Sequence, residues 1–363
     1  MINQNTFLSV FLHHQQHSVV FCFSFIQIFH NHQTEFTLLS AFSQINSFLF
    51  LEQQLFIPNL KINQTWKQNA TTVAGGHGYG SAPHQLHYPC GIFIDNDQTI
   101  YIADTFNNRT VEWKKDAING SIIIDRNGTQ NRSVQLNWQT KVIIDQENDS
   151  FIICDPGNQR VVRWPRRNDQ TGEVLISNIY CHDLIMDNCG YLYVSDPIKH
   201  EIRRWKRGET NRTIVAGGNR SGNGTNQLNS PSYIFIDEDH SVYVSDENNH
   251  RVMKWVKGAS EGIVVAGGRG QGNGSRQLSF PSGIIVDQLG SVYVADRYNH
   301  RVMRWLKGAE EGTVIVGGNG FGQQPNQFGY PTDLSFDREN NLYVLDHAND
   351  RVQRFDVNKN ENV

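Results

Sequence analysis

The stretch "VYVADRYNHRVMRW" (Val292–Trp305) decides the fold, because fifty residues earlier the chain reads "VYVSDENNHRVMKW" (Val242–Trp255). Self-similarity at a fixed period is typical of repeat architectures and has to be counted before any single motif is interpreted. From Lys61 onward six copies align, at spacings of 51, 41, 50, 50 and 50 residues. The Asp that closes the "VYVAD" element marks each copy: Asp104, Asp155, Asp196, Asp246, Asp296 and Asp346.

Each copy has the pattern of four short strands. In the fifth copy "GIIVD" (283–287) and "VYVAD" (292–296) are β-branched and separated by the turn signal "QLG", which predicts a hairpin. "RVMRW" (301–305) and "TVIVGG" (313–318) follow further turns and add two strands. No helical period competes with this pattern.

The strands are apolar at consecutive positions, so both faces of each small sheet have to be covered. A radial arrangement covers them, because each sheet packs between two neighbours and only short outer edges remain. The sequence therefore predicts an all-β fold, a six-bladed β-propeller of four-stranded antiparallel blades. A large aromatic residue ends the third strand of every copy and is expected to pack between blades: Trp113, Trp164, Trp205, Trp255, Trp305 and Phe355.

The two ends of the repeat region are complementary. An outer-strand sequence, "TTVAGG" (71–76), comes before the first inner strand, and the last copy stops after "RVQRF" (351–355) without an outer strand. We therefore expect residues 71–76 to pair with residues 351–355 and close the ring.

At "YVADRYNHRVMRW" and its five relatives the chain resembles the NHL-repeat family, whose units carry Pro-x-Gly-Ile-x-Val-Asp, Tyr-Val-Ala-Asp and Asn-His-Arg-Val elements. The resemblance covers about residues 70–356. It implies a β-propeller, but members of the family include substrate-recognition ends of ubiquitin ligases, sensor domains and, more distantly, a peptide-amidating lyase. The fold therefore does not fix the chemistry.

The repeated turn "DRYNHR" (296–301) has a structural interpretation. Its Asp can accept backbone N–H bonds, its Asn tolerates a left-handed conformation, and its Arg begins the next strand where it can pair with a carboxylate. An element present six times is a poor candidate for a single active site. The arginines of these turns are Arg109, Arg160, Arg251, Arg301 and Arg351.

Candidate binding residues are those that do not recur. The connectivity places the Gly-rich connections and the Asp turns on one face of the ring, here called the top, and binding residues tend to lie on such loops. Copy three lacks about ten residues of its connection, which predicts a notch beside Tyr180 and His182. His84 and His87 lie in the first connection and are also without counterparts.

These features favour a non-catalytic, monomeric binding or scaffold module whose top face engages a protein, peptide or glycan, with no cofactor and no metal. No Ser/His/Asp, Cys/His or paired-carboxylate set stands outside the repeat. Two alternatives stay open: a metal-dependent lyase or hydrolase that uses His84, His87 or His182, and an RNA-binding domain. The net charge of −4 disfavours RNA, since phosphate affinity needs clustered Lys and Arg.

Residues 1–57 differ from the propeller region, 58–363. They hold no Lys or Arg and eleven of the twenty Phe residues, and Val19–Phe29 has the length of a signal-peptide apolar region but is too short to span a bilayer. This segment is either a targeting leader, the only part expected to contact a membrane, a poorly ordered extension, or the product of a start codon assigned too far upstream.

Eleven Asn-x-Ser/Thr sequons and five cysteines bear on the compartment. In a secreted glycoprotein a Cys154–Cys181 disulfide could join neighbouring blades, whereas in a cytoplasmic protein both would be buried thiols. We expect an extracellular or secretory-pathway protein, with the cytoplasm as the alternative. The sequons begin at Asn63, Asn69, Asn108, Asn119, Asn127, Asn131, Asn148, Asn211, Asn219, Asn223 and Asn273.

Overall fold

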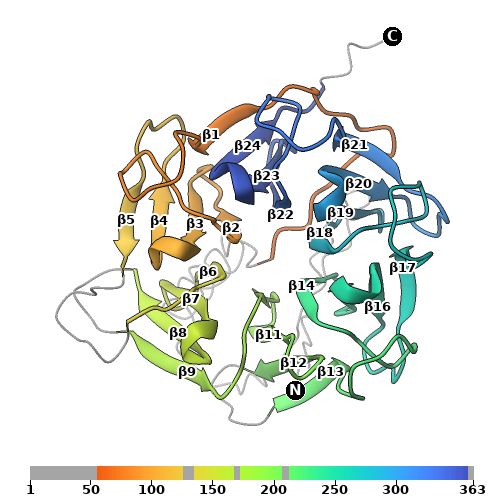
Figure 1. Cartoon of the computed structure of the whole chain (residues 1–363). Helices are drawn as coiled ribbons and strands as arrows, with labels where there is room; N and C mark the ends of the chain where they lie inside the picture. The colour runs from red at the N-terminus through yellow and green to blue at the C-terminus, as the bar shows by residue number, and fades with distance from the viewer. Residues whose placement is uncertain (1–54, 126–134, 167–171, 207–211, 359–363) are drawn as a thin grey trace, which may run out of the picture. The chain divides into compact units, whose positions relative to one another are not determined.

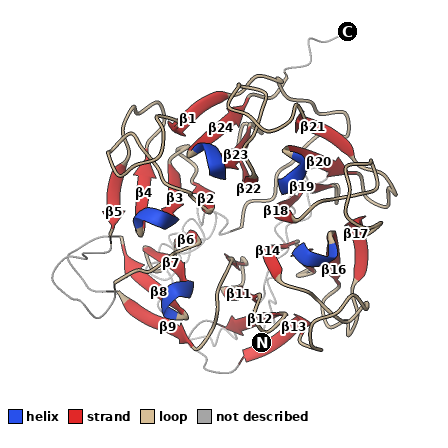
Figure 2. Ribbon diagram, in the orientation of Figure 1, coloured by secondary structure: helices blue, strands red, loops and turns tan. Residues whose placement is uncertain are grey.

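The computed structural model describes residues 55–125, 135–166, 172–206 and 212–358. Within them the chain forms six four-stranded antiparallel sheets around a central axis, and the only helices described are short 3-10 turns (Figure 1, Figure 2). The predicted six-bladed all-β propeller is therefore confirmed. No helix of the described residues is long and apolar enough to cross a membrane.

The strands of each blade follow one another from the axis outward. Blade 1 comprises β2 (Gly91–Ile94), β3 (Ile100–Asp104), β4 (Arg109–Trp113) and β5 (Ser121–Ile124). Blade 2 comprises β6 (Lys141–Asp145), β7 (Ser150–Asp155), β8 (Arg160–Pro165) and β9 (Glu173–Ser177). Blade 3 comprises β10 (Leu184–Met186), β11 (Tyr191–Asp196), β12 (Glu201–Lys206) and β13 (Arg212–Gly217).

The second half of the ring has the same order. Blade 4 comprises β14 (Pro231–Ile236), β15 (Val242–Asp246), β16 (Arg251–Trp255) and β17 (Ile263–Gly267). Blade 5 comprises β18 (Pro281–Val286), β19 (Val292–Asp296), β20 (Arg301–Trp305) and β21 (Thr313–Gly317). Blade 6 comprises β22 (Pro331–Phe336), β23 (Leu342–Asp346), β24 (Arg351–Phe355) and, as its outer strand, β1 (Thr71–Gly75).

Blade 6 is built from both ends of the described chain. Strand β1 pairs antiparallel with β24, so that Thr71 lies opposite Arg354 and Gly75 lies opposite Arg351. The register shifts by one residue between Thr72 and Ala74. The same shift occurs where the outer strand meets the third strand in the other five blades, so β1 takes the place of an outer strand fully.

Residues 55–70, here called the N-terminal arm, run from the axis to the outer edge between blades 5 and 6, as the orange trace in Figure 1 shows. The Trp66 indole is 1% exposed and donates to the Asn340 carbonyl at 2.9 Å, while its rings pack against Tyr293 and Phe336. Leu55 and Ile57, which lie at the end of the predicted leader 1–57, are buried in the propeller core.

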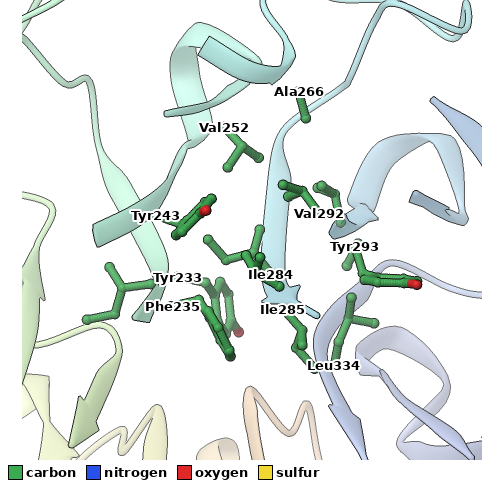
Figure 3. Close-up of a cluster of buried hydrophobic side chains, with 14 of the residues drawn as sticks. Tyr233, Phe235, Tyr243, Val252, Ala266, Ile284, Ile285, Val292, Tyr293 and Leu334 are labelled. Carbon is green, nitrogen blue, oxygen red and sulfur yellow. The ribbon is translucent and has the colours of Figure 1, made fainter. Parts of the chain in front are cut away.

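The core consists of side chains that fill the spaces between blades. Figure 3 shows one such region, where Tyr243, Ile284 and Tyr293 lie among other buried side chains of blades 4, 5 and 6. The tyrosines of the second strands also hold the hairpin turns, since the hydroxyl of Tyr293 donates to Asp287 at 3.1 Å and that of Tyr243 donates to Asp237 at 3.2 Å. Burial raises the pKa of both phenols.

Candidate functional site

The repeated Asp turn fixes the loops of the top face. Asp296 accepts from the Asn299 amide at 2.8 Å and from Arg301 Nε at 2.7 Å, and its other oxygen accepts the Ser279 N–H at 2.7 Å. Arg301 in turn donates to the carbonyls of Asn273 and Gly274 in the Gly-rich connection. Such buried, charge-assisted networks rigidify a structure when every member is satisfied.

The turn differs from the expectation in one respect. The left-handed residue is His300, at φ 53°, and Asn299 instead lies in the 3-10 helix η5 (Arg297–Asn299). The Asn amide is needed for the bond to Asp296, so the following residue has to reverse the chain before the next strand. The other 3-10 turns are η1 (Thr105–Asn107), η3 (Pro156–Asn158), η4 (Glu247–Asn249) and η6 (His347–Asn349).

An exposed group of rings covers the top of blades 1 and 2. It consists of Tyr79, His87, Tyr88, Phe106 and Trp138, and it is called the aromatic patch below. Neighbouring ring centroids lie 5.0–5.6 Å apart, and the largest exposed fractions are 73% at the first tyrosine and 56% at the tryptophan. Contiguous apolar surface of this kind marks interaction sites in soluble proteins.

Two residues of the aromatic patch sit on an unusual backbone. Tyr88 has φ 45° and Trp138 has φ 58°, a region that bulky residues rarely adopt. Their N–H groups donate to side chains of the preceding blade, to Asp350 and Asn108, both at 2.7 Å. The backbone is thus held in place from outside, and the rings are presented to solvent. The same positive-φ backbone occurs at the equivalent positions of blades 4, 5 and 6, at Ser230, Phe280 and Tyr330, so it is a structural feature of the repeat.

A second group of rings lies on the top of blades 5 and 6 and is called the blade-5 cluster. Its members Phe280, Tyr298 and Tyr330 have centroids 4.8 and 5.1 Å apart. Here the chain supplies its own cation, since the guanidinium of Arg297 lies 5.6 Å from the Tyr298 ring centroid.

Charged and polar side chains surround the top mouth of the central channel. Arg297 lies 3.6 Å from Glu247. His347 Nδ1 lies 2.9 Å from the Pro89 carbonyl and therefore carries the proton of that bond, while the Cys90 sulfur lies 3.9 Å from the same nitrogen. Burial lowers the pKa of His347 to about 4 and raises the pKa of the Cys90 thiol. The pair is accordingly a thiol beside a neutral imidazole. The nitrogen nearer the sulfur, Nδ1, already carries the proton donated to Pro89, so it cannot accept the proton of the thiol.

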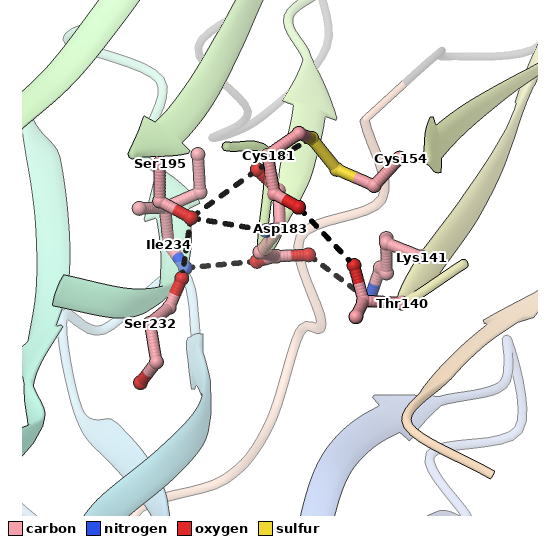
Figure 4. Close-up of a disulfide and its surroundings, with 8 residues drawn as sticks. All are labelled: Thr140, Lys141, Cys154, Cys181, Asp183, Ser195, Ser232 and Ile234. Carbon is pink, nitrogen blue, oxygen red and sulfur yellow. Dashed lines mark hydrogen bonds and ion pairs between the residues drawn. A yellow bond between two sulfur atoms is a disulfide. The ribbon is translucent and has the colours of Figure 1, made fainter. Parts of the chain in front are cut away.

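Below the mouth three charges meet across the channel. The Lys141 ammonium lies 2.6 Å from Asp333 and 3.7 Å from Asp183. Asp183 also accepts the Ile234 N–H, and Figure 4 shows Asp183 between Lys141 and Ile234. Desolvation, partly opposed by the nearby lysine, raises the pKa of Asp183 to about 7. The Tyr233 hydroxyl spans from blade 4 to the Cys90 carbonyl of blade 1 at 2.6 Å.

A cavity of about 110 Å³ lies beside these charges, walled by apolar side chains such as Ile143 and Phe235. Leu55, Phe56 and Pro58 of the N-terminal arm also line it, and the arm bonds to turns of the bottom face, with the Gln288 N–H donating to Pro58. The arm therefore lines the channel on its bottom side.

The predicted binding residues divide into two pairs. His87 belongs to the aromatic patch, and His84 lies nearby with its ring 5.3 Å from His77. His182 lies at the mouth against Tyr233 at 5.1 Å, and burial lowers its pKa to about 4. Tyr180 is 41% exposed. Among the described residues no contact joins the two pairs.

Sequence reasoning missed the patch residues Tyr88, Phe106 and Trp138. A signal was available for two of them, because the third residue before Gly91, Lys141 and the equivalent position of the other copies is aromatic in five of six copies. These residues are Tyr88, Trp138, Tyr180, Phe280 and Tyr330.

Blades 2 and 3 are joined covalently near the mouth. Cys154 and Cys181 form a disulfide with their Cα atoms 5.3 Å apart, as predicted, and both are fully buried (Figure 4). Cys90 is a free thiol. In the described part of the chain no three His, Cys, Asp or Glu side chains gather in a way that could hold a metal ion.

Comparison with known proteins supports the repeat assignment. The NHL repeat model matches residues 278–304, and no curated protein matches the sequence. A structural genomics protein of unknown function from Bacteroides thetaiotaomicron is similar over 80% of this chain and 76% of its own, with 17% identity and a TM-score of 0.64. An auxiliary nutrient binding protein from the same organism is similar over 81% and 78%, with 16% identity and a TM-score of 0.64.

An enzyme shares the architecture as well. A gluconolactonase from Xanthomonas campestris is similar over 85% of this chain and 99% of its own, with 13% identity and a TM-score of 0.58. At these identities the likeness concerns the fold alone, so the site residues have to carry any statement about function.

Proposed function

We propose that this chain, an NHL-repeat β-propeller, is a non-catalytic binding module of the extracellular or secretory compartment, with its ligand on the top face beside the channel mouth. The observation that carries the proposal is the aromatic patch. Its rings are exposed although the same chain buries nearly all its strand aromatics. The positive-φ backbone that presents Tyr88 and Trp138 is a feature of the repeat and holds these rings in fixed positions.

The catalytic alternative has less support. The ammonium of Lys141 lies between Asp183 and Asp333, where it neutralises the carboxylates that a cation would otherwise use. His182, one of the histidines considered as a ligand, has one ring nitrogen facing the Ser232 backbone and packs on Tyr233. The gluconolactonase shares the ring of blades, and these side chains offer no activated nucleophile or open metal position.

Export from the cell is supported by two features. The buried disulfide between Cys154 and Cys181 suits an oxidising compartment. Most described sequons also begin at exposed asparagines, as glycan attachment requires. The exposed ones are Asn63, Asn69, Asn119, Asn148, Asn219, Asn223 and Asn273.

Asn108 is the exception. It is half-buried, and its side-chain oxygen accepts the Trp138 N–H. A glycan there would disturb the backbone beneath the aromatic patch, so we propose that this sequon stays unmodified while others carry glycans.

The test uses the full chain expressed in a secreting eukaryotic cell line. We expect glycosylated protein in the medium and occupancy at Asn223 and Asn273, mapped by mass spectrometry. The secreted protein is then applied to peptide and glycan arrays beside a Phe106→Ala/Trp138→Ala variant and a matched Tyr298→Ala control. Signals that disappear only in the double variant support the proposal, whereas signals that survive it place the ligand elsewhere.

A further inference from the structure

We infer that the aromatic patch receives the positively charged side chain of a Lys- or Arg-bearing peptide segment in a partner protein. This inference rests on the proposed function, because it names the chemistry of the ligand for the same face. It follows from a comparison of blade 1 with blade 5, which share the repeat but differ at the first two positions of the 3-10 turn.

In blade 5 those two positions are Arg297 and Tyr298, and the guanidinium lies over the ring at 5.6 Å. In blade 1 they are Thr105 and Phe106. The threonine hydroxyl is buried and donates to the Ala103 carbonyl, so it makes no use of the ring face. The cation–π contacts of the described residues all involve rings outside the aromatic patch. The rings of blade 1 are thus exposed without the cation that blade 5 provides for itself.

The charge beneath the patch is negative. At the left-handed position that follows the 3-10 turn, blade 6 has Asp350, whereas the other blades have uncharged or weakly basic residues there: Asn108, Gln159, His200, His250 and His300. Asp350 accepts the Tyr88 N–H at 2.7 Å and forms no ion pair with a Lys or Arg of the described chain. Its electrostatic neighbours are the His87 imidazole of the patch and the Asp104 carboxylate. Asp104, in contrast, is neutralised by Arg109 at 2.6 Å.

An aromatic face attracts cations, and an unneutralised carboxylate behind it strengthens that attraction. The centroids of Tyr88, Phe106 and Trp138 follow one another at 5.0 and 5.6 Å, which forms a strip long enough for an extended peptide to lie along. A phosphate backbone would be repelled by Asp350. A neutral sugar could stack on the rings but would gain nothing from the carboxylate.

The test measures fluorescence anisotropy of labelled Gly/Ser peptides that differ only at a central block of Arg, Lys, Gln or Glu. The proteins are the wild type, Phe106→Leu, Trp138→Leu and Asp350→Asn, with Tyr298→Leu as the matched control in the blade-5 cluster. Circular dichroism and melting curves establish that each variant is folded. A neutral oligosaccharide is titrated in parallel.

We expect the Arg and Lys peptides to bind and the Gln and Glu peptides to bind at least about 10-fold more weakly. The patch variants and Asp350→Asn should each weaken binding by about 3- to 30-fold, in the range of a cation–π contact, while Tyr298→Leu leaves it unchanged. No binding by any basic peptide, equal binding of the Gln peptide, or a neutral Asp350→Asn overturns the inference. If the oligosaccharide binds and Trp138→Leu abolishes that binding, the inference fails while the proposed function stands. If a ligand binds equally well to every patch variant, both the inference and the proposed function fail.

Discussion

Replacement of Lys141 by Met should destabilise the propeller strongly. The lysine side chain is 12% exposed, and its partners Asp183 and Asp333 are 3% and 4% exposed, so all three charges lie away from water. Removing one member of a buried ion pair leaves an uncompensated charge and costs about 3–5 kcal/mol. Met keeps the volume of the side chain, so the loss measures charge and not packing. The corresponding fall in Tm is roughly 6–15 °C.

The penalty should depend on pH. Burial raises the pKa of Asp183 to about 7, so the folded protein keeps this proton in a range where the unfolded chain has lost it. Because the pKa of Asp183 is higher in the folded protein than in the unfolded chain, this group contributes stability at pH values below its unfolded pKa. That contribution is lost as the pH rises through 7. Without Lys141, which lowers this pKa, the loss moves to still higher pH and becomes larger. Lys141→Met should therefore cost more at pH 8 than at pH 5.5.

The assay is urea unfolding followed by circular dichroism at both pH values. Lys254→Met is the matched control, because its ion pair with Asp237 is more exposed and should be worth about 1 kcal/mol or less. Adding Asp183→Asn to Lys141→Met should restore part of the loss, since one of the two unpaired carboxylates is then gone. A penalty for Lys141→Met below about 1 kcal/mol, or one that is equal at both pH values, would refute the reasoning.

Three further outcomes are expected. Trp66→Ala should cost about 3–5 kcal/mol in chemical unfolding, because the N-terminal arm loses the ring that fills the space between blades 5 and 6. His347→Gln should reduce the loss of stability in acid. The pKa of His347 is about 4 in the folded protein and lies below the pKa of this histidine in the unfolded chain, so the stability that the neutral imidazole contributes above pH 6.5 is lost as the pH falls through 4. Melting curves at a series of pH values measure this loss. Cys154→Ser with Cys181→Ser should cost about 2–4 kcal/mol, and thiol mapping of the wild type should find neither cysteine free.

The period and the strand pattern were enough to predict the fold. Every blade contains the four strands expected, because β-branched runs between turn residues specify hairpins locally and six copies leave little choice of packing. The N-terminal arm could not be predicted in the same way. It lies outside the repeat, and Trp66 is a single aromatic residue with no periodic partner, so its place between blades 5 and 6 depends on contacts with residues more than two hundred positions away.

The site was predicted only in part. His87 was chosen because it does not recur, and it does lie in the aromatic patch. Trp138 and Tyr88 were not predicted, because the binding residues were chosen among those that do not recur, whereas an aromatic residue recurs at this position of the repeat. Their positive φ values, which turn the rings toward solvent, depend on acceptors in the neighbouring blade and are invisible in a local sequence pattern.

The channel shows how a repeat can still be searched for function. Asp296 and its counterparts are the same residue in all six copies, because each blade needs the same turn. The position at which the inner segments approach the axis instead holds four different residue types in the six copies. A packing role alone would favour similar residues at this position. Its variation therefore identifies a repeat position at which the six blades differ, and all three channel charges occupy it. In chain order the residues are Gly91, Lys141, Asp183, Tyr233, Gly283 and Asp333.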